Sequence, residues 1–354
     1  MKMFRRTIPF LTAALLLAAC GKDTAGAPEG GEPSAGGGMV EMTFGFSASD
    51  LKTPVVKAGT MDDDLLDNLW VLQFDGQAES SVLELCEYYP LERIADNKVS
   101  VALYESDTQV RIYFVANVGQ DEFASLAAGS TLGDFEARVL GMADEAAVSG
   151  SGHLPMAGTY DGSVSFQEQD VTLTRMVAKI AFTCTVDIPA AGESFTIGRI
   201  QLTDVATGTR YKEFTVPTAR TGLFPDAAST DNFTDYALES ASASETAEIT
   251  RTWYLPENLR GVVEGLTART KGGGNVPAHS TCIEVSGDYT KGDAVYDVTY
   301  RIYPGQNNST DFNMIRNHSY TISSTIKGFN EHDLRVEVEK GIPAGKYLDG
   351  EWTE

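Results

Sequence analysis

The sequence is poor in cysteine, histidine and tryptophan, and it has no apolar run long enough to cross a bilayer. The 354 residues include 4 cysteines, 4 histidines and 3 tryptophans. No cysteine or histidine falls in a CxxC, HxxxH or HExxH pattern, which argues against a metal site. Basic residues are also scarce, since 27 of them stand against 50 acidic ones for a net charge of -23. Nucleic acid requires clustered Lys and Arg, so we expect no nucleic-acid partner.

The common catalytic and cofactor motifs are missing as well. GxSxG, GxxxxGK[ST] and a GxGxxG linked to a strand are all absent. The glycine-rich KGGGNVP at 271–277 is not followed by a helical pattern, so it reads as a loop rather than a phosphate site. The acidic stretch Asp62–Asp67 lacks the central Gly and final Glu of an EF-hand. We therefore predict no catalytic residues, no cofactor and no metal, with a hydrolase built from dispersed acids as an alternative.

The first twenty residues have the layout of a secretory signal peptide. A positive region ending at Arg6 precedes about a dozen mostly apolar residues at 8–19. That run is too short for a permanent span, which needs about 20 residues. LAAC at 17–20 resembles the bacterial lipobox, in which the cysteine is acylated and becomes the first mature residue. We therefore expect a lipid on Cys20, the alternative being an ordinary signal peptide with an incidental cysteine.

Residues 21–39 and 341–354 are expected to lie outside the folded part. The first stretch consists mainly of Gly, Pro, Ala and acidic residues, which cannot bury enough apolar area to offset chain entropy. It is predicted to be a flexible tether between a lipid surface and the folded part. The second stretch, GIPAGKYLDGEWTE, is short and only modestly apolar, so it is predicted to be a tail.

Between these ends, the chain reads as one strand after another. Apolar residues alternate with polar ones in segments bounded by Gly, Asn, Asp and Pro, which is typical of antiparallel strands with one wet face. NLWVLQFDG is apolar on both faces and predicts a doubly buried strand that includes Trp70. The first strand carries Met42, Phe44 and Phe46 on one side. The even positions of 176–186 are apolar or thiol, so Cys184 is predicted to be a core residue.

Helix is scarce, and the chain is long enough for two domains. The best helical segment is STLGDFEARVLG, where Thr131 and Asp134 form a capping-box pattern. Short helical turns are expected at Asp62–Asp67 and Asp121–Ala128. We place the domains at 40–165 and 166–340, with a boundary at 188–194 as the alternative. Residues 205–250 are expected to form long loops, and no internal repeat of 20–50 residues is evident.

Aromatic side chains raise the question of carbohydrate binding. Trp253 and Tyr254 precede Leu-Pro, and we expect them to be semi-exposed, where they would form a sugar platform. The remaining cysteines, Cys86, Cys184 and Cys282, are about a hundred residues apart. An odd number of thiols allows one disulfide with a spare thiol, or none, and the pattern does not decide between them.

Several segments together resemble the fimbrillin families of the Bacteroidetes, the FimA/Mfa-type or type V pilin proteins and their lipoprotein accessory subunits. The matching segments are LAAC at 17–20, NLWVLQFDG at 68–76, VRIYFVANVG at 110–119, LPMAG at 154–158, VTLTRMVAKIAF at 171–182, WYLPENLRG at 253–261 and NMIRNHSYTISSTIKG at 313–328. The resemblance implies an all-β protein of two antiparallel, transthyretin-like Greek-key β-sandwich domains with few short helices. It also implies a lipoprotein of the outer membrane or of fimbriae, with other fimbrial subunits as partners.

In polymerising members of that family, a trypsin-like protease removes the lipidated N-terminal piece, and a strand from another subunit fills the groove left behind. Here the strand that would be lost carries Met42, Phe44 and Phe46. The family's cleavage usually follows Arg, yet no Arg lies between Cys20 and Arg93. Lys57 and Ala58 occupy roughly the expected place. If the protease requires Arg, the chain keeps its lipid, which favours an anchor, accessory or tip role over a stalk role.

The main functional hypothesis is therefore a non-catalytic surface lipoprotein that assembles by donor-strand exchange and serves adhesion to a host or bacterial ligand. The alternative is a surface glycan-binding lipoprotein of a nutrient uptake system. That alternative depends on Trp253 and Tyr254 being available to a sugar.

Overall fold

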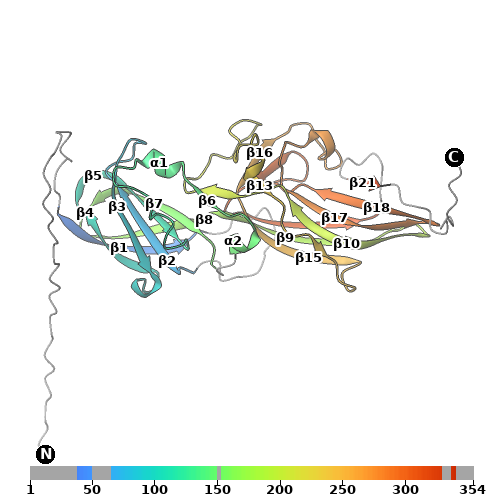
Figure 1. The fold of residues 1–354 in the computed structure, drawn as a ribbon, viewed down its shortest axis with the longest axis horizontal. Coiled ribbons are helices and arrows are strands. Elements are labelled where there is room, and N and C mark those ends of the chain that lie inside the picture. Colours follow the sequence, from blue (N-terminus) through green and yellow to red (C-terminus); the bar gives the residue numbers. More distant parts are fainter. Residues whose placement is uncertain (1–37, 50–64, 150–152, 329–335, 340–354) are drawn as a thin grey trace, which may run out of the picture. The chain divides into compact units, whose positions relative to one another are not determined.

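The computed structural model describes residues 38–49, 65–149 and 153–328, together with the backbone of 336–339 (Figure 1). Within these residues the protein is mostly β, as the alternating pattern predicts, with only short helices. Residues 21–37 of the predicted tether, the tail and the candidate residues Cys20, Lys57 and Ala58 fall outside the described residues, whereas Met39, which was assigned to the tether, is the first residue of β1.

The described chain consists of a first half, from β1 to β8, and a second half, from β9 to β21. Seven strands of the first half form one connected set in the order β3-β2-β5-β7-β8-β1-β4 (Figure 1). Their bounds are β1 Met39–Ala48, β2 Asn68–Phe74, β3 Leu83–Pro90, β4 Lys98–Tyr104, β5 Ser106–Ala116, β7 Met156–Val164 and β8 Glu168–Arg175. β7 and β8 are paired only at the start of β7 and the end of β8, where Met156 faces Arg175 and Ala157 faces Thr174. The set therefore consists of two groups of strands, β3-β2-β5-β7 and β8-β1-β4, that are joined at one place.

The second half repeats this pattern of strand pairing. Three strands lie in the order β15-β9-β20 and five in the order β14-β10-β17-β18-β21. Their bounds are β9 Val177–Val186, β10 Glu193–Thr203, β14 Glu239–Ser240, β15 Glu248–Pro256, β17 Cys282–Lys291, β18 Ala294–Ile302, β20 Ser319–Ile326 and β21 Val336–Glu339. The first strand of each half, β1 or β9, lies between an antiparallel partner and a parallel one.

The parallel pairs differ from the antiparallel arrangement that the sequence predicts. β1 runs parallel to β8, and β9 runs parallel to β20. In both cases the first strand of the half pairs with a strand near the end of that half, β8 or β20, so the connection between the two is long enough to cross over. Alternation of apolar residues reports which face of a strand is buried, and it carries no information on the direction of the neighbour.

Alternation does predict which side chains enter the cores. β4 reads KVSVALY with every second residue buried, while β2 is buried on both faces, as expected for NLWVLQF. Leu69 and Val71 of β2 belong to one apolar cluster, whereas Trp70 and Leu72 belong to another on the opposite face. The predicted core positions of Trp70 and Cys184 are confirmed, since they are 7% and 0% exposed.

The one helix that the sequence predicts begins with the expected capping box. In α1, Leu132–Glu136, the Thr131 hydroxyl accepts from the Asp134 amide, and the Thr131 amide donates to the Asp134 carboxylate. A second helix, α2 at Glu145–Ser149, was not expected. The short turn expected at 121–128 is present, with i to i+3 hydrogen bonds between Asp121 and Ala124 and between Phe123 and Leu126, and the first half of the turn expected at 62–67 lies outside the described residues. Three 3-10 turns lie at Leu91–Arg93, Thr230–Asn232 and Gly273–Asn275.

Residues 205–250 contain short strands joined by loops, much as the sequence predicts. Small two-stranded ladders complete the described fold: β11 with β13, β12 with β6, and β16 with β19. Their bounds are β6 Val139–Gly141, β11 Val205–Ala206, β12 Gly208–Arg210, β13 Phe233–Thr234, β16 Asn258–Val262 and β19 Asp311–Met314. The β6–β12 ladder joins a segment of the first half to one of the second.

The place of the domain boundary remains a prediction. A boundary at residue 165 would separate β8 from β7 and β1, with which it pairs. The strand pairing instead favours a boundary just after Arg175, where β8 ends and the chain turns into β9 at Val177.

Candidate functional site

The candidate assembly strand, β1, is an inner strand of its group. It pairs antiparallel with β4 through seven residues, from Met39 opposite Tyr104 to Gly45 opposite Lys98. On its other side it pairs in parallel with β8, from Thr43 opposite Glu168 to Ala48 opposite Leu173. Because both of its edges are paired, β1 fills a slot between β4 and β8.

The side chains predicted to line that slot are buried. Met42 and Phe44 are 0% exposed and Phe46 is 7% exposed. The Phe44 ring lies 4.7 Å from the ring of Phe114 on β5, measured between centroids, and Phe46 lies 5.2 Å from the same ring. These three side chains therefore supply β1's share of the apolar core of the first half.

The end of β1 is tied to the second half of the chain. Ser49 lies directly after β1, and its carbonyl oxygen accepts from Nη1 of Arg175 at 2.8 Å. The same Arg175 nitrogen donates to Oδ1 of Asn317, and Nδ2 of Asn317 donates to the Ser49 hydroxyl, each at 2.8 Å. Arg175 and Asn317 are 4% and 3% exposed, so this is a buried polar junction.

The predicted sugar platform is not at the surface. Trp253 is 2% exposed and Tyr254 is 6% exposed, which corrects the expectation that they are semi-exposed. They lie on β15, which pairs with β9, and the Trp253 ring packs 6.2 Å from the ring of Phe182. Tyr254 lies under the ammonium group of Lys179, at 5.2 Å. Neither ring offers an open face for a sugar to stack on.

The three described cysteines are free thiols. Burial raises the pKa of the Cys86 thiol to about 11 and that of Cys184 to about 12. Thiols that stay protonated at neutral pH are poor nucleophiles and poor metal ligands. Within the described residues, no three His, Cys, Asp or Glu side chains come together as metal ligands. In the same residues, no helix has the length and apolar character needed to cross a membrane.

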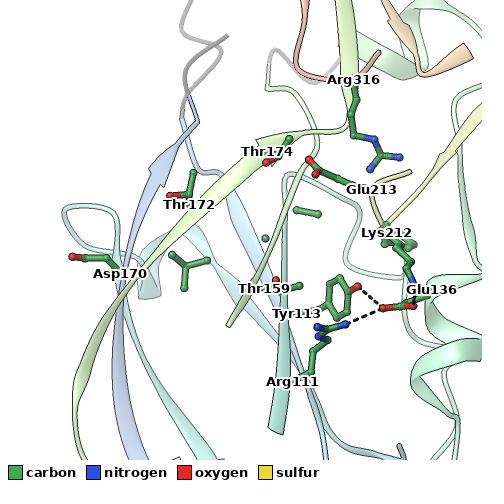
Figure 2. Close-up of a pocket in the computed structure, with 14 residues that line it drawn as sticks. Arg111, Tyr113, Glu136, Thr159, Asp170, Thr172, Thr174, Lys212, Glu213 and Arg316 are labelled. Carbon is green, nitrogen blue, oxygen red and sulfur yellow. Dashed lines mark hydrogen bonds and ion pairs between the residues drawn. The ribbon is translucent and has the colours of Figure 1, made fainter. Parts of the chain in front are cut away.

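A polar cavity of about 490 Å³ lies beside β8, and we call it the β8 cavity (Figure 2). Its wall comes from β5, α1, β7 and β8, together with residues 211–213 and Arg316 of the second half. The labelled residues that line it are Arg111, Tyr113, Glu136, Thr159, Asp170, Thr172, Thr174, Lys212, Glu213 and Arg316. Along β8 the side chains alternate, so that Val171 and Leu173 enter the core and the threonines between and after them face the cavity.

One side of the β8 cavity is organised around the buried carboxylate of Glu136. The Tyr113 hydroxyl donates to its Oε1 at 2.8 Å, and Nη1 of Arg111 lies 3.4 Å from the same oxygen. Lys212 donates to Oε2. Arg111 also forms a bidentate pair with Asp161, with distances of 2.8 and 2.7 Å, and this pair raises the pKa of the guanidinium. The charges on this side therefore neutralise one another.

The other side of the β8 cavity carries a buried ion pair. Arg316 is 4% exposed and Glu257 is 1% exposed. Nη2 of Arg316 lies 3.1 Å from Oε1 of Glu257 and donates to the Thr209 hydroxyl at 2.8 Å. Burial raises the pKa of the Glu257 carboxyl, although the nearby guanidinium opposes the shift. In Figure 2 the Arg316 side chain reaches into the space beside Glu213 and Thr174.

Sequence reasoning did not find the β8 cavity. Its residues are up to 205 positions apart, from Arg111 to Arg316, and no spacing rule joins them. The only local signal is the outward row of Asp170, Thr172 and Thr174 on β8, which looks like an ordinary wet strand face.

Comparison with known proteins places the fold. Residues 253–324 match DUF4906, a domain of unknown function. No curated protein matches the chain. Among solved structures, a candidate cell adhesion protein from Parabacteroides distasonis aligns with a TM-score of 0.54 at 17% identity, covering 86% of this chain and 98% of the other. A candidate cell adhesion protein from Bacteroides eggerthii aligns with a TM-score of 0.52 at 15% identity, covering 88% and 98%.

The tip fimbrial protein Mfa3 from Porphyromonas gingivalis, with a C-terminal truncation, also aligns, with a TM-score of 0.49 at 17% identity over 86% of this chain and 99% of that one. The segments between residues 68 and 328 that carry the resemblance lie in strands and in the loops that connect them. The chain therefore shares the fold of these two cell adhesion proteins over 86–88% of its length.

Proposed function

We propose that the protein is a non-catalytic fimbrial subunit of accessory, anchor or tip type, which assembles by exchange of β1 and serves adhesion at the cell surface. The observation that carries the proposal is the position of β1, inserted between β4 and β8 with its apolar side chains in the core. The shared fold with Bacteroidetes cell adhesion proteins supports it.

The proposed architecture is a pair of transthyretin-like β-sandwiches. In each half, the same pairing recurs: the first strand lies between an antiparallel neighbour and a parallel strand from near the end of that half. Each half also has its own apolar cluster, drawn from both of its strand groups. Two groups of strands that share one core pack as a sandwich.

Loss of β1 would expose an apolar slot and two unpaired strand edges. Full burial of a Met or Phe side chain is worth about 1.5–3 kcal/mol, so the three side chains of β1 contribute about 5–9 kcal/mol. A domain has a net stability of only about 5–15 kcal/mol. The first half would therefore depend on another strand to refill the slot, which would satisfy the edges of β4 and β8 as well.

The lipid anchor and the processing step belong to the same proposal. A lipid on Cys20, followed by the tether at 21–39, would hold the folded part at the outer membrane. If cleavage after Lys57 occurs, β1 leaves with the lipid and the subunit is freed to polymerise. If no cleavage occurs, β1 stays in its slot and the subunit remains an anchor or an accessory component.

The alternative of a glycan-binding lipoprotein for nutrient uptake finds no support at Trp253 and Tyr254, since both rings are buried. The hydrolase alternative would need catalytic acids close together in a cleft. The acids that line the β8 cavity include Glu136, whose two oxygens are already held by Tyr113, Arg111 and Lys212. We therefore propose strand exchange rather than catalysis.

The test is strand complementation. The chain beginning at Ala58 lacks β1, and it would be mixed with a synthetic peptide of residues 40–48 or with a matched peptide that carries Phe44→Asn. We expect the truncated chain alone to form SDS-resistant ladders or to lose thermal stability. The native peptide should restore a stable monomer, and the Phe44→Asn peptide should not.

Two results would contradict strand exchange. One is a truncated chain that stays monomeric and as stable as the full chain without any peptide. The other is equal rescue by both peptides, because binding in the slot would then not depend on the apolar side chain of Phe44. Separately, N-terminal sequencing and lipid labelling of the protein from cells would decide whether Cys20 or Ala58 is its first residue.

A further inference from the structure

The β8 cavity contains polar groups that nothing in the described part of the chain satisfies. Arg316 uses Nε and Nη2 for Glu257 and Thr209, and its Nη1 has no hydrogen-bond partner among the described residues. Thr172 and Thr174 on β8 and Thr159 on β7 make no side-chain hydrogen bond there, and Glu213 makes no ion pair. The wall therefore offers a ligand the Nη1 donor of Arg316, the carboxylate acceptor of Glu213 and three threonine hydroxyls, each of which can donate or accept a hydrogen bond.

The unused nitrogen of Arg316 is the most informative of these groups. The Arg316 side chain as a whole is only 4% exposed, yet its Nη1 is not one of the fully buried unpartnered atoms of the described residues, so this nitrogen reaches the open space of the cavity. Its ion pair with Glu257 fixes the plane of the guanidinium, and Figure 2 shows the group directed into the cavity beside Glu213. A ligand that accepts from Nη1 would meet a donor that is already in position.

The balance of charge decides what kind of ligand fits. Three basic side chains line the cavity, Arg111, Lys212 and Arg316, against three acidic ones, Glu136, Asp170 and Glu213. Two further acids, Asp161 and Glu257, pair with these bases from behind. With three bases against five acids, the surroundings carry a net charge of −2, which disfavours phosphate, sulfate or a carboxylate ligand. A metal ion is disfavoured because three of the five acids are paired with these bases, and no three acidic, His or Cys side chains of the described residues come together as ligands.

We propose that the β8 cavity binds a neutral saccharide of one or two rings. A sugar carries adjacent hydroxyls that each donate and accept, which matches a wall of alternating donors, acceptors and hydroxyls. Planar guanidinium and carboxylate groups can contact two such hydroxyls at once, in the bidentate geometry that makes these groups selective. A volume of about 490 Å³ falls within the usual range for small-molecule sites.

This site is independent of the strand-exchange proposal. It uses the outward face of β8, whereas β1 packs against the edge and core side of the same strand. A subunit whose β1 never leaves would still present the cavity. Failure of strand complementation would therefore leave the saccharide proposal standing, and the reverse also holds.

The experiment uses saturation-transfer NMR on the full chain from residue 21. The neutral probes are the methyl glycosides of glucose, galactose, mannose and N-acetylglucosamine, with lactose and maltose as disaccharides. Glucuronic acid and N-acetylneuraminic acid form the anionic arm, and glycylglycine forms the zwitterionic arm. The affinity of the best neutral probe is then measured by calorimetry for the native chain and its variants.

The test variant is the double substitution Glu213→Gln and Thr172→Val, at two exposed positions that line the cavity. The matched control is Glu264→Gln with Thr196→Val, which makes the same chemical changes at exposed positions away from the cavity. Arg316 is left unchanged because its substitution would strand the buried Glu257. We expect the test variant to weaken binding of the neutral probe at least tenfold and the control to leave it unchanged.

Three outcomes would overturn the proposal. The first is no saturation transfer to any neutral probe. The second is equal loss of binding in the test and control variants, or loss in neither. The third is a preference for the anionic or zwitterionic probes, which would show that the balance of charge in the cavity has been misjudged.

Discussion

Truncation of Phe44 gives the most direct measure of how firmly β1 is held. Its ring is 0% exposed and lies 4.7 Å from Phe114 and 5.7 Å from Tyr160, between centroids. Phe→Ala at a fully buried site costs about 3–5 kcal/mol through lost burial and the cavity left behind. We expect Phe44→Ala to lower the free energy of unfolding of the first half by about 4 kcal/mol, a large share of what a domain has.

The matched comparison is the neighbouring Thr43, which points to the opposite face. Its hydroxyl makes one exposed hydrogen bond with Ser100, at 3.0 Å. Thr43→Ala should therefore cost about 1 kcal/mol or less. Urea unfolding gives the free energies, and hydrogen exchange read by mass spectrometry locates the change. In Phe44→Ala, the amides of β4 and β8 should exchange faster, while those of β17 should not.

Equal costs for the two substitutions would refute the reasoning. They would mean that the apolar face of β1 is not what holds the strand between β4 and β8. Faster exchange throughout β17 as well would mean that the two halves unfold as one unit, so the loss could not be assigned to the slot.

Three further predictions concern single side chains. Thr131→Ala removes the capping box with Asp134 and should cost about 0.5–2 kcal/mol, seen as faster hydrogen exchange at the start of α1. Burial lowers the pKa of Lys271 to about 8. In the unfolded chain this lysine has its ordinary pKa, near 10.4. Between about pH 8 and about pH 10.4 the unfolded chain therefore binds more protons than the folded one. As the pH rises through this range, the free energy of unfolding should increase by roughly 3 kcal/mol. Urea unfolding between about pH 8 and about pH 10.4 should show this increase in the native chain and not in Lys271→Met. Identical pH profiles of the two chains would contradict a lowered pKa of Lys271. Glu257→Gln leaves the Arg316 charge buried without its ion-pair partner and should cost about 3–5 kcal/mol in urea unfolding, whereas a loss under 1 kcal/mol would contradict a tight pair.

The strands were predictable because burial of one face of a strand produces an alternation of apolar and polar residues in the sequence. The residues of β4 and β2 show which side chains enter a core without any knowledge of the neighbours. The capping box of α1 was equally visible, because its two residues lie three positions apart and interact locally.

Partners and exposure were harder to predict because they depend on distant segments. The parallel pairing of β1 with β8 brings together residues about 125 positions apart. Because Trp253 lies shortly before a Leu-Pro pair, the sequence predicts that it is semi-exposed. In the structure, the ring is covered by the neighbouring strand β9 and by the apolar core of the second half. The β8 cavity depends on Arg316 arriving from the second half, and no pattern within a window of residues reports such a meeting.

The hydrogen bond between Ser49 and Asn317 has a consequence for the order of events during biogenesis. A chain that leaves the ribosome or an export channel N-terminus first presents β1 before any of its partners. β4 follows some 60 residues later, β8 about 130 residues later, and Asn317 after 268 residues. The earliest strand to emerge is thus among the last to be fully paired, and until then its Met and Phe side chains form an exposed apolar segment that is prone to aggregation.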